Sequence, residues 1–582
     1  MKFKFTILTC ITCMAVLTTK GQEVDQMITA KFQQSTPYDN SCPDSTMAGC
    51  GPIAVAQILS YYKQPAHGYG DVSYTSGAYD INVCMDSLSF DWNNMLDEYI
   101  YVDSTQYRNY TDAEGKAVAD VVFGCGVAMH ATYGDSATGV NNYAMMMYGM
   151  QHYLHMSVDS RYLRRMHYST AEWIEMLNEQ LWAGHPVFYR GDWYWTSRGT
   201  KSGHMFVIDG LDTDGNYHFN FGHGTGSGRN LYDKYTDINV INYSGTYPGG
   251  RPVCYNAGQA MVINCFPTPD YQDYPSNMCF SDASIIINKD TTVTSIEVGL
   301  GEAFYLGCSL RNANWEKVSI NYGWAIEKEG EFQEIISQST YSLSAGNTFS
   351  SMKHLNVSLP TTLDDGEYKL ALYFKQTSDS VWQKVCDCAQ SEVDATISGG
   401  IATITASGNH MQDPQLYLAE DITEVEPEYY SSEPGRSFRL VIANPTTNNF
   451  QDTIRLEITT NGEQYTYDAI LPVYSQTQTE FHYLISDSML DIEGMDITEI
   501  TPYYYYALEG RFIKFGESVN SVESIMDDDV SSDITVYTLD GIKIASIKAE
   551  KVETGYPSLL NSLARGIYII KEGNKSRKIL KR

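Results

Sequence analysis

The chain has 582 residues, of which 43% are hydrophobic and 19% are charged, and its formal net charge is −32. A single hydrophobic core stops growing well below this length, so we expect several domains. The composition is that of a folded protein rather than a disordered one. Nucleic-acid binding draws on clustered Lys and Arg, so the acidic balance argues against a nucleic-acid partner.

The N-terminus has the pattern of a secretory signal peptide, which we assign to residues 1–21. Lys2 and Lys4 precede the short apolar stretch 5–17, and small or polar residues follow up to Gly21. The stretch is too short to span a bilayer comfortably, and no later run is apolar enough to do so. We therefore expect an exported protein without a membrane span.

Residues 22–267 mix helical and strand patterns and are predicted to form an α+β domain. The predicted helices carry start signals, such as Pro52 in a first turn and the capping box of Ser169 and Glu172. They cover residues 50–62, a stretch that includes residues 117–122, and residues 169–184. The predicted strands are residues 186–189, 204–209 and 217–221, and a turn at residues 212–215 joins the last two.

The helical period disappears after about residue 268, and short alternating runs separated by turns indicate β-sandwiches. A polar stretch at residues 424–432 favours two Ig-like sandwiches over one, and we assign them to residues 268–405 and 406–525. The motif Asp364-x-Gly366-x-Tyr368 at the start of a predicted strand resembles a tyrosine corner.

Cys50 is the first candidate for catalysis, because it lies in the first turn of a predicted helix. The partial positive charge at a helix N-terminus lowers the pKa of a thiol and favours the nucleophilic thiolate, and the backbone N–H there can serve an oxyanion hole. On this segment alone, a small apolar helix cap explains the cysteine equally well. A thiolate also needs a proton shuttle from elsewhere in the chain.

His204 is the candidate for that shuttle, since it begins a largely apolar strand that would hold its ring rigidly. The next strand carries Asn220, whose side chain can accept a hydrogen bond from an imidazole and fix its orientation. A lone histidine on an apolar strand is usually structural. The chain order Cys50, His204, Asn220, with the last two on consecutive strands, favours a catalytic arrangement instead.

These residues belong to a series of short motifs that resembles the streptopain family of cysteine peptidases, which implies a papain-like fold. The match runs in order from about residue 31 to residue 265. Its motifs are Gln34-x-x-Pro37-Tyr38-Asp39, Ala48-Gly49-Cys50 with Ala56-Gln57-Ile58, Cys125-Gly126-Val127-Ala128 with Tyr133-Gly134, Glu172-Trp173 with Met176-Leu177, Ala183-Gly184-His185-Pro186-Val187, Gly203-His204 with Asp209-Gly210, His218-Phe219-Asn220, and Tyr255-Asn256-x-x-Gln259-Ala260.

By this resemblance, Cys50 is the nucleophile and His204 is the general base and then the general acid. Asn220 would orient His204, and the side-chain amide of Gln34 would stabilise the oxyanion, a contribution of about 3–4 kcal/mol in related chemistry. No cofactor or metal is implied. No CxxC pair has zinc spacing, and the chain has no HExxH motif.

Three features depart from the family pattern. Phe32-Gln33 precedes Gln34 where the family usually has Trp, and Asn220-Phe221-Gly222-His223-Gly224 stands where it usually has Asn-Trp-Gly-Trp-Gly. The second change puts another titratable ring, His223, near the site. Only about a dozen residues separate Gly21 from Gln34, too few for the inhibitory propeptide of the family. We therefore expect a chain that is active once its signal peptide is removed, and that is restrained by a separate inhibitor protein or by delayed folding.

Residues 526–582 resemble the C-terminal sorting domain that the type IX secretion system of Bacteroidetes recognises. The resemblance rests on residues 536–541, residues 563–570 and the basic end at residues 578–581. It implies export through the periplasm, with the type IX machinery as a partner, to the cell surface or the medium. A third small β domain is the alternative.

The sequence thus predicts a secreted cysteine endopeptidase that hydrolyses protein or peptide substrates through a thioester. Two other functions use the same features. The altered tryptophan positions and the short N-terminal stretch would suit a binding or adhesion protein built on a degenerate peptidase domain, although Cys50, His204 and Asn220 are all present. An acyl transferase would use the same thiol on an amine acceptor.

Overall fold

The structure is a computed structural model. It describes residues 23–105, 107–134, 137–140, 142–195, 200–224, 234–239, 242–243, 253–268, 278–280, 285–290, 293, 295–312, 316–385, 392–406, 415–425, 435–460, 463–486, 497–506, 511–516, 534–538, 543–547, 566–572 and 575–581. The predicted signal peptide lies outside these ranges. No helix of the described ranges is long and apolar enough to cross a membrane.

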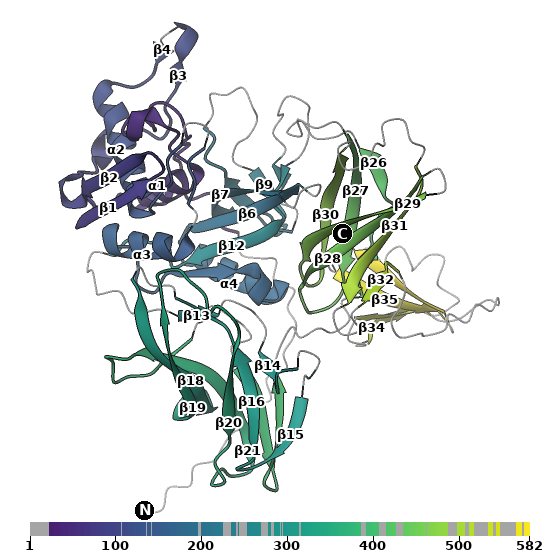
Figure 1. Ribbon diagram of the computed structural model, residues 1–582. Helices are drawn as coiled ribbons and strands as arrows, with labels where there is room; N and C mark the ends of the chain where they lie inside the picture. The colour runs from purple at the N-terminus through teal and green to yellow at the C-terminus, as the bar shows by residue number, and fades with distance from the viewer. Residues whose placement is uncertain are drawn as a thin grey trace, which may run out of the picture.

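One antiparallel sheet organises the N-terminal domain, with the strand order β5-β12-β6-β7-β8-β9 (Figure 1). Its strands are β5 (Arg161–Arg164), β6 (Val187–Trp195), β7 (Thr200–Leu211), β8 (Tyr217–Asn220), β9 (Lys234–Thr236) and β12 (Ala257–Ile263). Along β7, Met205 and Val207 belong to one hydrophobic core, whereas Phe206 and Ile208 belong to another. Because successive strand residues point to opposite faces, the sheet separates two cores.

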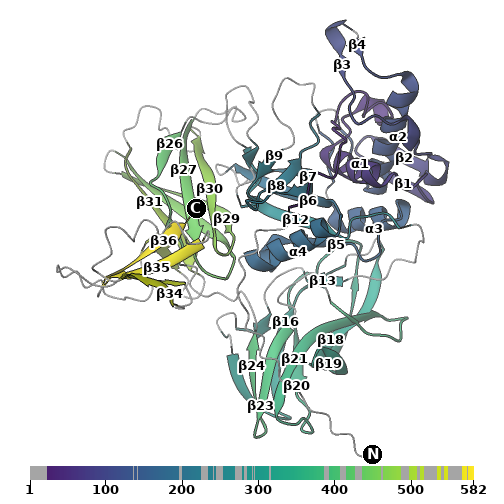
Figure 2. The same cartoon turned by 180° about the vertical axis from the view of Figure 1, so that it is seen from behind.

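Helices pack on both faces of this sheet (Figures 1 and 2). The helices are α1 (Cys50–Tyr62), α2 (Asp112–Ala128), α3 (Tyr143–Tyr153) and α4 (Thr170–Trp182). The first three contribute to one core and α4 to the other. The predicted helices and strands of this domain are confirmed, including the capping box of Ser169 and Glu172. The sequence did not predict α3, which Asn142 caps by accepting from two backbone N–H groups.

Short two-stranded elements complete the domain. They are the hairpin of β1 (Asp71–Ser76) and β2 (Tyr79–Cys84), the hairpin of β3 (Tyr101–Val102) and β4 (Tyr107–Arg108), and the pair of β10 (Asn242–Tyr243) and β11 (Val253–Cys254). Figure 1 shows β3 and β4 at an outer edge of the domain, beyond α2.

Residues 23–34 form an extended segment that is hydrogen-bonded to the sheet and to α1. Val24 and Leu211 exchange two backbone hydrogen bonds of 2.8 and 2.9 Å. The backbone N–H of Ile28 donates to the buried carboxylate of Asp209 at 2.7 Å, and that carboxylate also bonds His218 Nδ1 at 2.6 Å. This segment therefore belongs to the folded domain, and it carries Gln34 toward the start of α1.

The region after residue 278 contains two sheets around one core. One sheet has the order β14-β16-β20, and the other has β15-β24-β23-β21-β18-β19 with β22 beside β21. The strands are β14 (Ile286–Ile287), β15 (Ser295–Gly299), β16 (Ala303–Cys308), β18 (Val318–Lys328), β19 (Glu331–Leu343), β20 (Lys353–Ser358), β21 (Gly366–Gln376), β22 (Gln383–Lys384), β23 (Glu392–Ser398) and β24 (Ile401–Ala406), with β13 (Met278–Phe280) paired to β17 (Leu310–Asn312). The Tyr368 hydroxyl donates to the Asp364 carbonyl at 3.1 Å, which confirms the contact expected of a tyrosine corner.

A second pair of sheets surrounds a separate core. Strands β25, β26, β27 and β30 form one sheet, and β29-β28-β31-β32 the other. Their bounds are β25 (Tyr417–Leu418), β26 (Thr423–Val425), β27 (Gly435–Asn444), β28 (Phe450–Thr460), β29 (Glu463–Val473), β30 (Thr477–Ser486), β31 (Ile497–Tyr506) and β32 (Arg511–Lys514). We refer to this pair of sheets, residues 417–514, as the second sandwich.

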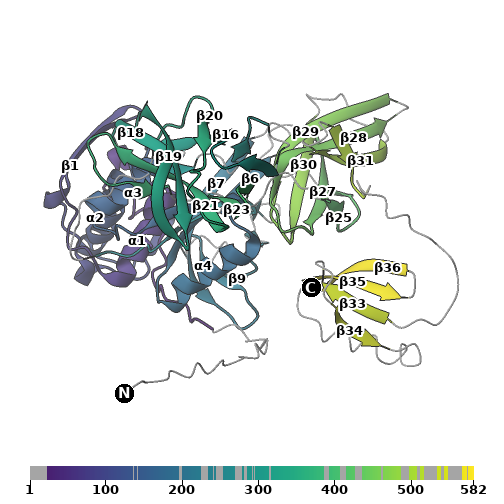
Figure 3. The ribbon, with the colours of Figure 1, turned by 90° about the horizontal axis from the view of Figure 1, so that it is seen from below.

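The C-terminal region contains a four-stranded sheet of order β34-β33-β35-β36 (Figure 3). Its strands are β33 (Ile534–Thr538), β34 (Lys543–Ile547), β35 (Gly566–Glu572) and β36 (Lys575–Lys581). A small β-rich unit was predicted here. Its role in sorting stays a prediction, as do the domain boundaries and the Ig-like character of the sandwiches.

Candidate active site

Cys50 is the first residue of α1, as predicted. Gly49 precedes it with a φ of 90°, a conformation that favours glycine. A Cβ at position 49 would lie 2.9 Å from atoms of Thr138, so a larger residue would displace the start of the helix. The first N–H groups of a helix have no partner within the helix, and that of Gly51 hydrogen-bonds the thiol.

The environment of Cys50 favours the thiolate. Burial alone would raise the pKa of this thiol. The hydrogen bond to the His204 side chain, the charge of that imidazole and backbone hydrogen bonds from Met205 and Gly51 together outweigh burial and lower the pKa below its usual range. Cys50 and His204, predicted from distant segments, are therefore in direct contact.

A backbone carbonyl holds the imidazole of His204. Its Nε2 lies 2.8 Å from the carbonyl oxygen of Phe221, and the ring is only 6% exposed. A carbonyl oxygen can only accept, so Nε2 carries a hydrogen and donates to it. Nδ1 is then the nitrogen left to exchange a proton with Cys50, and the Phe221 carbonyl fixes the tautomer.

The hydrogen bonds of the Asn220 side chain go to groups other than the His204 imidazole, the partner that the sequence led us to expect. Its Nδ2 donates to the carbonyl of Ala30 at 2.9 Å, and its Oδ1 accepts from the N–H of Gly222 at 3.2 Å. Asn220 pairs with Val207 in the sheet, three residues beyond His204, so the expected hydrogen bond to the imidazole is wrong. Asn220 instead ties the N-terminal segment to the turn that presents the Phe221 carbonyl.

Gln34 lies beside the segment that leads to the nucleophile. Its carbonyl accepts from the N–H of Ala48 at 3.0 Å. The Phe32 N–H donates to Gln57 Oε1 at 3.2 Å, and the Gly224 N–H donates to the Phe32 carbonyl at 3.0 Å. The backbone around Gln34 is thus held by α1 and by the turn after β8, while the half-buried Gln34 amide makes no hydrogen bond to a described residue.

Two aromatic rings stack on His204. The His223 ring lies 4.7 Å from it with an interplanar angle of 2°, and the Tyr255 ring lies 5.4 Å away at 28°. The Phe221 ring lies further away, at 6.4 Å. His223 therefore provides the nearest ring, at one of the positions where the family usually has Trp.

The other described thiols differ from Cys50. Burial raises the pKa of Cys42, Cys265 and Cys308 to about 12, and it also raises the pKa of Cys125. Cys84 is exposed. Among the cysteines whose environment the structure describes, Cys50 is the one with a lowered thiol pKa.

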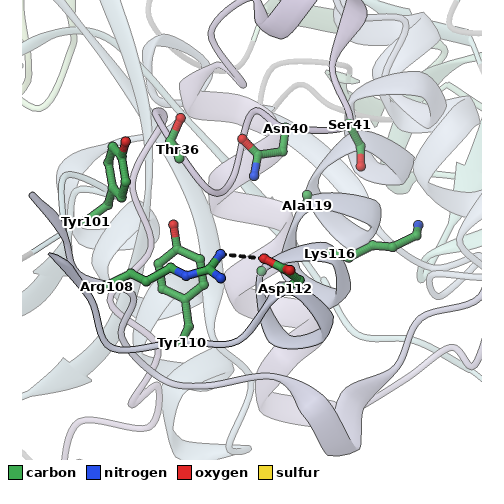
Figure 4. A pocket seen from close by; sticks show the side chains of 10 residues that line it. Thr36, Asn40, Ser41, Tyr101, Arg108, Tyr110, Asp112, Lys116 and Ala119 are labelled. Atoms are coloured by element: carbon green, nitrogen blue, oxygen red, sulfur yellow. Dashed lines mark hydrogen bonds and ion pairs between the residues drawn. The ribbon is translucent and has the colours of Figure 1, made fainter. Parts of the chain in front are cut away.

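A solvent-open pocket of about 770 Å³ lies next to the segment that follows Gln34 (Figure 4). The start of α2 and the β3–β4 hairpin contribute to its walls, and Arg108 and Asp112 form a 2.5 Å ion pair in its lining. None of the four predicted catalytic residues lines this pocket. It is therefore a feature separate from the Cys50–His204 pair.

Sequence reasoning missed two parts of this site. The Phe221 carbonyl is a backbone group, so no residue type signals its role. Tyr255 belongs to one of the motifs that carried the resemblance, and an aromatic residue there could have been proposed as a wall of the site. Its contact with His204 depends on Gly191, because a Cβ at that position would lie 2.4 Å from the Tyr255 carbonyl.

Comparisons with known proteins find similarity in the N-terminal part of this chain. The peptidase C10 family matches residues 32–232, which include all four predicted catalytic residues. Streptopain of Streptococcus pyogenes serotype M28 (strain MGAS6180) is 24% identical over 267 residues, which are 44% of this chain and 62% of streptopain. The thiol protease/hemagglutinin PrtT of Porphyromonas gingivalis is 25% identical over 244 residues, 40% of this chain and 26% of that protein.

A solved structure gives a further match. The active wild-type cysteine protease interpain A of Prevotella intermedia is 30% identical, and the match covers 42% of this chain and 95% of interpain A with a TM-score of 0.36. The chain spans about three fifths of the length of streptopain. Through residues 32–232, this chain belongs to the peptidase C10 family, the family of streptopain.

Proposed function

We propose that this protein is a cysteine endopeptidase that hydrolyses polypeptides, with Cys50 as nucleophile and His204 as general base and acid. The observation that carries the proposal is the hydrogen-bonded pair of Cys50 and His204, in which the pKa of the thiol is lowered despite burial. A thiolate is the nucleophilic form of cysteine, and a neighbouring imidazole is its usual activator.

The first step forms an acyl-enzyme. The Cys50 thiolate attacks the carbonyl carbon of a peptide bond, and the carbonyl electrons move to its oxygen. The Cys50 backbone N–H and the Gln34 side-chain amide would stabilise this oxyanion. When the intermediate collapses, the amine leaves with a proton from His204 Nδ1, and a thioester to Cys50 remains.

The second step releases the acyl group. His204, now neutral, takes a proton from water through Nδ1, and the resulting hydroxide attacks the thioester carbon. The Cys50 thiolate leaves, and the imidazole is again protonated. The Phe221 carbonyl keeps Nε2 hydrogen-bonded throughout, which holds the ring in one orientation. Asn220 acts as a positioning residue through the turn and the segment that it joins.

We also propose that the protein acts outside the cytoplasm. The predicted signal peptide, the resemblance of residues 526–582 to a type IX sorting domain and the four-stranded sheet found there support this proposal. Its partners would be protein or peptide substrates, the type IX machinery and a separate inhibitor protein. The same thiol would serve an acyl transferase if an amine replaced water, so product analysis with and without added amine separates the two reactions.

Cys50→Ala tests the proposal, with Cys84→Ala as the matched control. We expect Cys50→Ala to abolish peptide hydrolysis and to leave folding unchanged, and Cys84→Ala to keep full activity. Because the pKa of Cys50 is lowered, its thiolate persists at pH values where an ordinary thiol is protonated. Iodoacetamide should therefore label Cys50 first, and the labelling rate should fall only as the pH drops through this lowered pKa.

Two results would contradict the proposal. One is peptide hydrolysis by purified Cys50→Ala at the wild-type rate. The other is labelling of Cys50 and Cys84 at equal rates at pH 6, as read from peptide mass spectrometry.

A further inference from the structure

The turn between β29 and β30 of the second sandwich is buried against the catalytic domain. Tyr474 and Ser475 are 2% and 1% exposed. The N–H of Thr170, at the start of α4, donates to Ser475 Oγ at 2.9 Å, and the Thr170 hydroxyl donates to the Ser475 carbonyl at 2.6 Å. Figures 1 and 2 show the second sandwich beside the strands of the catalytic sheet.

Asn449 adds a second anchor from the same sandwich. Its Nδ2 lies within hydrogen-bond distance of three carbonyls of the catalytic domain, those of Arg165, Met166 and Tyr168, at 3.2, 3.0 and 2.9 Å. Its Oδ1 accepts from the Ser475 N–H at 2.8 Å. The contact is thus built from buried and half-buried polar groups that satisfy one another, and such groups hold one geometry more strictly than apolar contact does.

The Tyr474 hydroxyl bonds a backbone group at an irregular position of the catalytic sheet. The pairing of β12 with β6 shifts between Ala257 and Ala260, which is a β-bulge. A bulge leaves a backbone group outside the ladder. Here the N–H of Gln259, within the bulge, donates to the Tyr474 hydroxyl at 3.0 Å. A residue of the second sandwich therefore supplies the partner that the sheet itself does not.

A buried cation lies at the same contact. Arg165 is 0% exposed, and its guanidinium donates to the side-chain oxygens of Gln259 and Asn239 at 2.6 and 2.5 Å. No described carboxylate pairs with it. The Tyr474 ring lies 4.4 Å from the guanidinium carbon and adds a cation–π contact. Burying an unpaired charge is costly, so the cation–π contact with Tyr474 adds to the hydrogen bonds that stabilise Arg165 here.

Two further contacts connect Gln259 with His204. Gln259 Nε2 donates to the Tyr255 carbonyl at 3.2 Å. The Tyr255 ring in turn stacks on His204. Tyr474 therefore reaches His204 through Gln259 and Tyr255.

We propose that Tyr474 and Asn449 are positioning residues of the peptidase. The second sandwich then contributes to catalysis and is more than an appended module. This inference rests on the proposed function. The family match ends at residue 232, so Tyr474 and Asn449 lie outside it. The sandwich fixes the bulge of β12, the bulge fixes Tyr255, and the Tyr255 ring packs on the imidazole of His204, which the Phe221 carbonyl holds.

The test uses the full chain with Tyr474→Phe, which keeps the ring over Arg165 and removes the hydroxyl that accepts from the Gln259 N–H. Tyr465→Phe is the control, since Tyr465 lies on the same sandwich and its hydroxyl bonds only an exposed carboxylate, that of Glu463. We expect Tyr474→Phe to lower kcat by roughly three- to tenfold with KM unchanged. The pH profile of Cys50 alkylation should move to higher pH, because a displaced imidazole stabilises the thiolate less.

Asn449→Ala and a double-mutant cycle extend the test. Asn449→Ala should also lower kcat, as Tyr474→Phe does. Tyr474→Phe combined with Gln259→Ala should cost less than the product of the two single effects, since both act on one path. Urea unfolding is measured for each variant. It shows whether a lower kcat comes from a displaced imidazole or from a smaller fraction of folded protein.

The outcomes distinguish this inference from the proposed function. If Cys50→Ala is inactive while Tyr474→Phe and Asn449→Ala have wild-type kcat and an unchanged alkylation profile, the positioning role is wrong and the peptidase assignment stands. If Cys50→Ala keeps activity, the proposed function fails first. A loss of kcat in Tyr465→Phe equal to that in Tyr474→Phe would also overturn the positioning role.

Discussion

Replacing Asn220 with alanine tests how the imidazole of His204 is held. The side chain of Asn220 makes two buried hydrogen bonds, one to the Ala30 carbonyl and one from the Gly222 N–H. Each group left unpaired in the interior costs about 1–3 kcal/mol. We therefore expect the free energy of unfolding to fall by roughly 2–6 kcal/mol, with kcat lowered about tenfold because the Phe221 carbonyl shifts with its turn.

The contrasting expectation comes from a direct bond between Asn220 and the imidazole. In a serine triad, spoiling the residue that orients the histidine lowers kcat by about 10⁴ while the geometry stays intact. The two accounts therefore differ in which quantity changes most, the stability or the turnover.

The assay measures urea unfolding and steady-state hydrolysis of one peptide substrate by the same preparations. Asn256→Ala is the control, because Asn256 is 3% exposed and neither polar atom of its side chain has a hydrogen-bond partner among the described residues. It removes the same atoms from a buried site without breaking a protein hydrogen bond, so both quantities should change little. A loss of kcat of a thousandfold or more in Asn220→Ala, at unchanged stability, would refute the structural role and restore the predicted triad.

Two further predictions concern the ring at position 223 and the C-terminal region. His223→Ala should lower kcat only about two- to fivefold, since it removes one stacked ring and leaves the Phe221 carbonyl in place. If this variant is more impaired than Asn220→Ala, His223 takes a direct part in proton transfer. A chain that ends at Asp527 should accumulate in the periplasm of the producing cell, as measured by fractionation and immunoblotting. Its appearance outside the cell at the full-length level would rule out a sorting role for residues 526–582.

The sequence predicted the parts of the site that residue type and local pattern encode. A cysteine followed by Gly51 and Pro52 marks the start of a helix, and the structure begins α1 at that cysteine. His204 was found because an apolar strand holds it. The missed helix α3 also had a local signal, since Asn142 is a good N-cap residue.

The parts that the sequence could not predict depend on backbone groups and on distant chain segments. Any residue at position 221 would present a carbonyl, so the partner of His204 has no signature in the sequence. The hydrogen bond between Gln259 and Tyr474 joins residues 215 positions apart, and nothing in either segment indicates the other. Asn220 was predicted to orient His204, but a strand register decided which neighbours its amide would reach.

The N-terminal segment shows how the fold sets the position of Gln34. Its buried residues alternate with more exposed ones, and each of Ile28, Ala30 and Phe32 uses a backbone group to bond a buried side chain of the domain. The partners are Asp209, Asn220 and Gln57, from three different elements. The spacing of two residues is that of an extended chain, so residue 34 continues the bonded series, and its carbonyl accepts from Ala48.

This arrangement fixes the register of the segment as well as its path. Apolar contacts alone would tolerate sliding, whereas a buried donor or acceptor that loses its partner pays the full cost of desolvation. A slip by one residue would exchange the two sides of the segment and break all three bonds at once. Oxyanion stabilisation depends on the position of a donor to within a fraction of an ångström. Asp209, Asn220 and Gln57 can therefore all serve the proposed chemistry although none of them needs to touch a substrate, because together they fix where the Gln34 amide lies relative to Cys50.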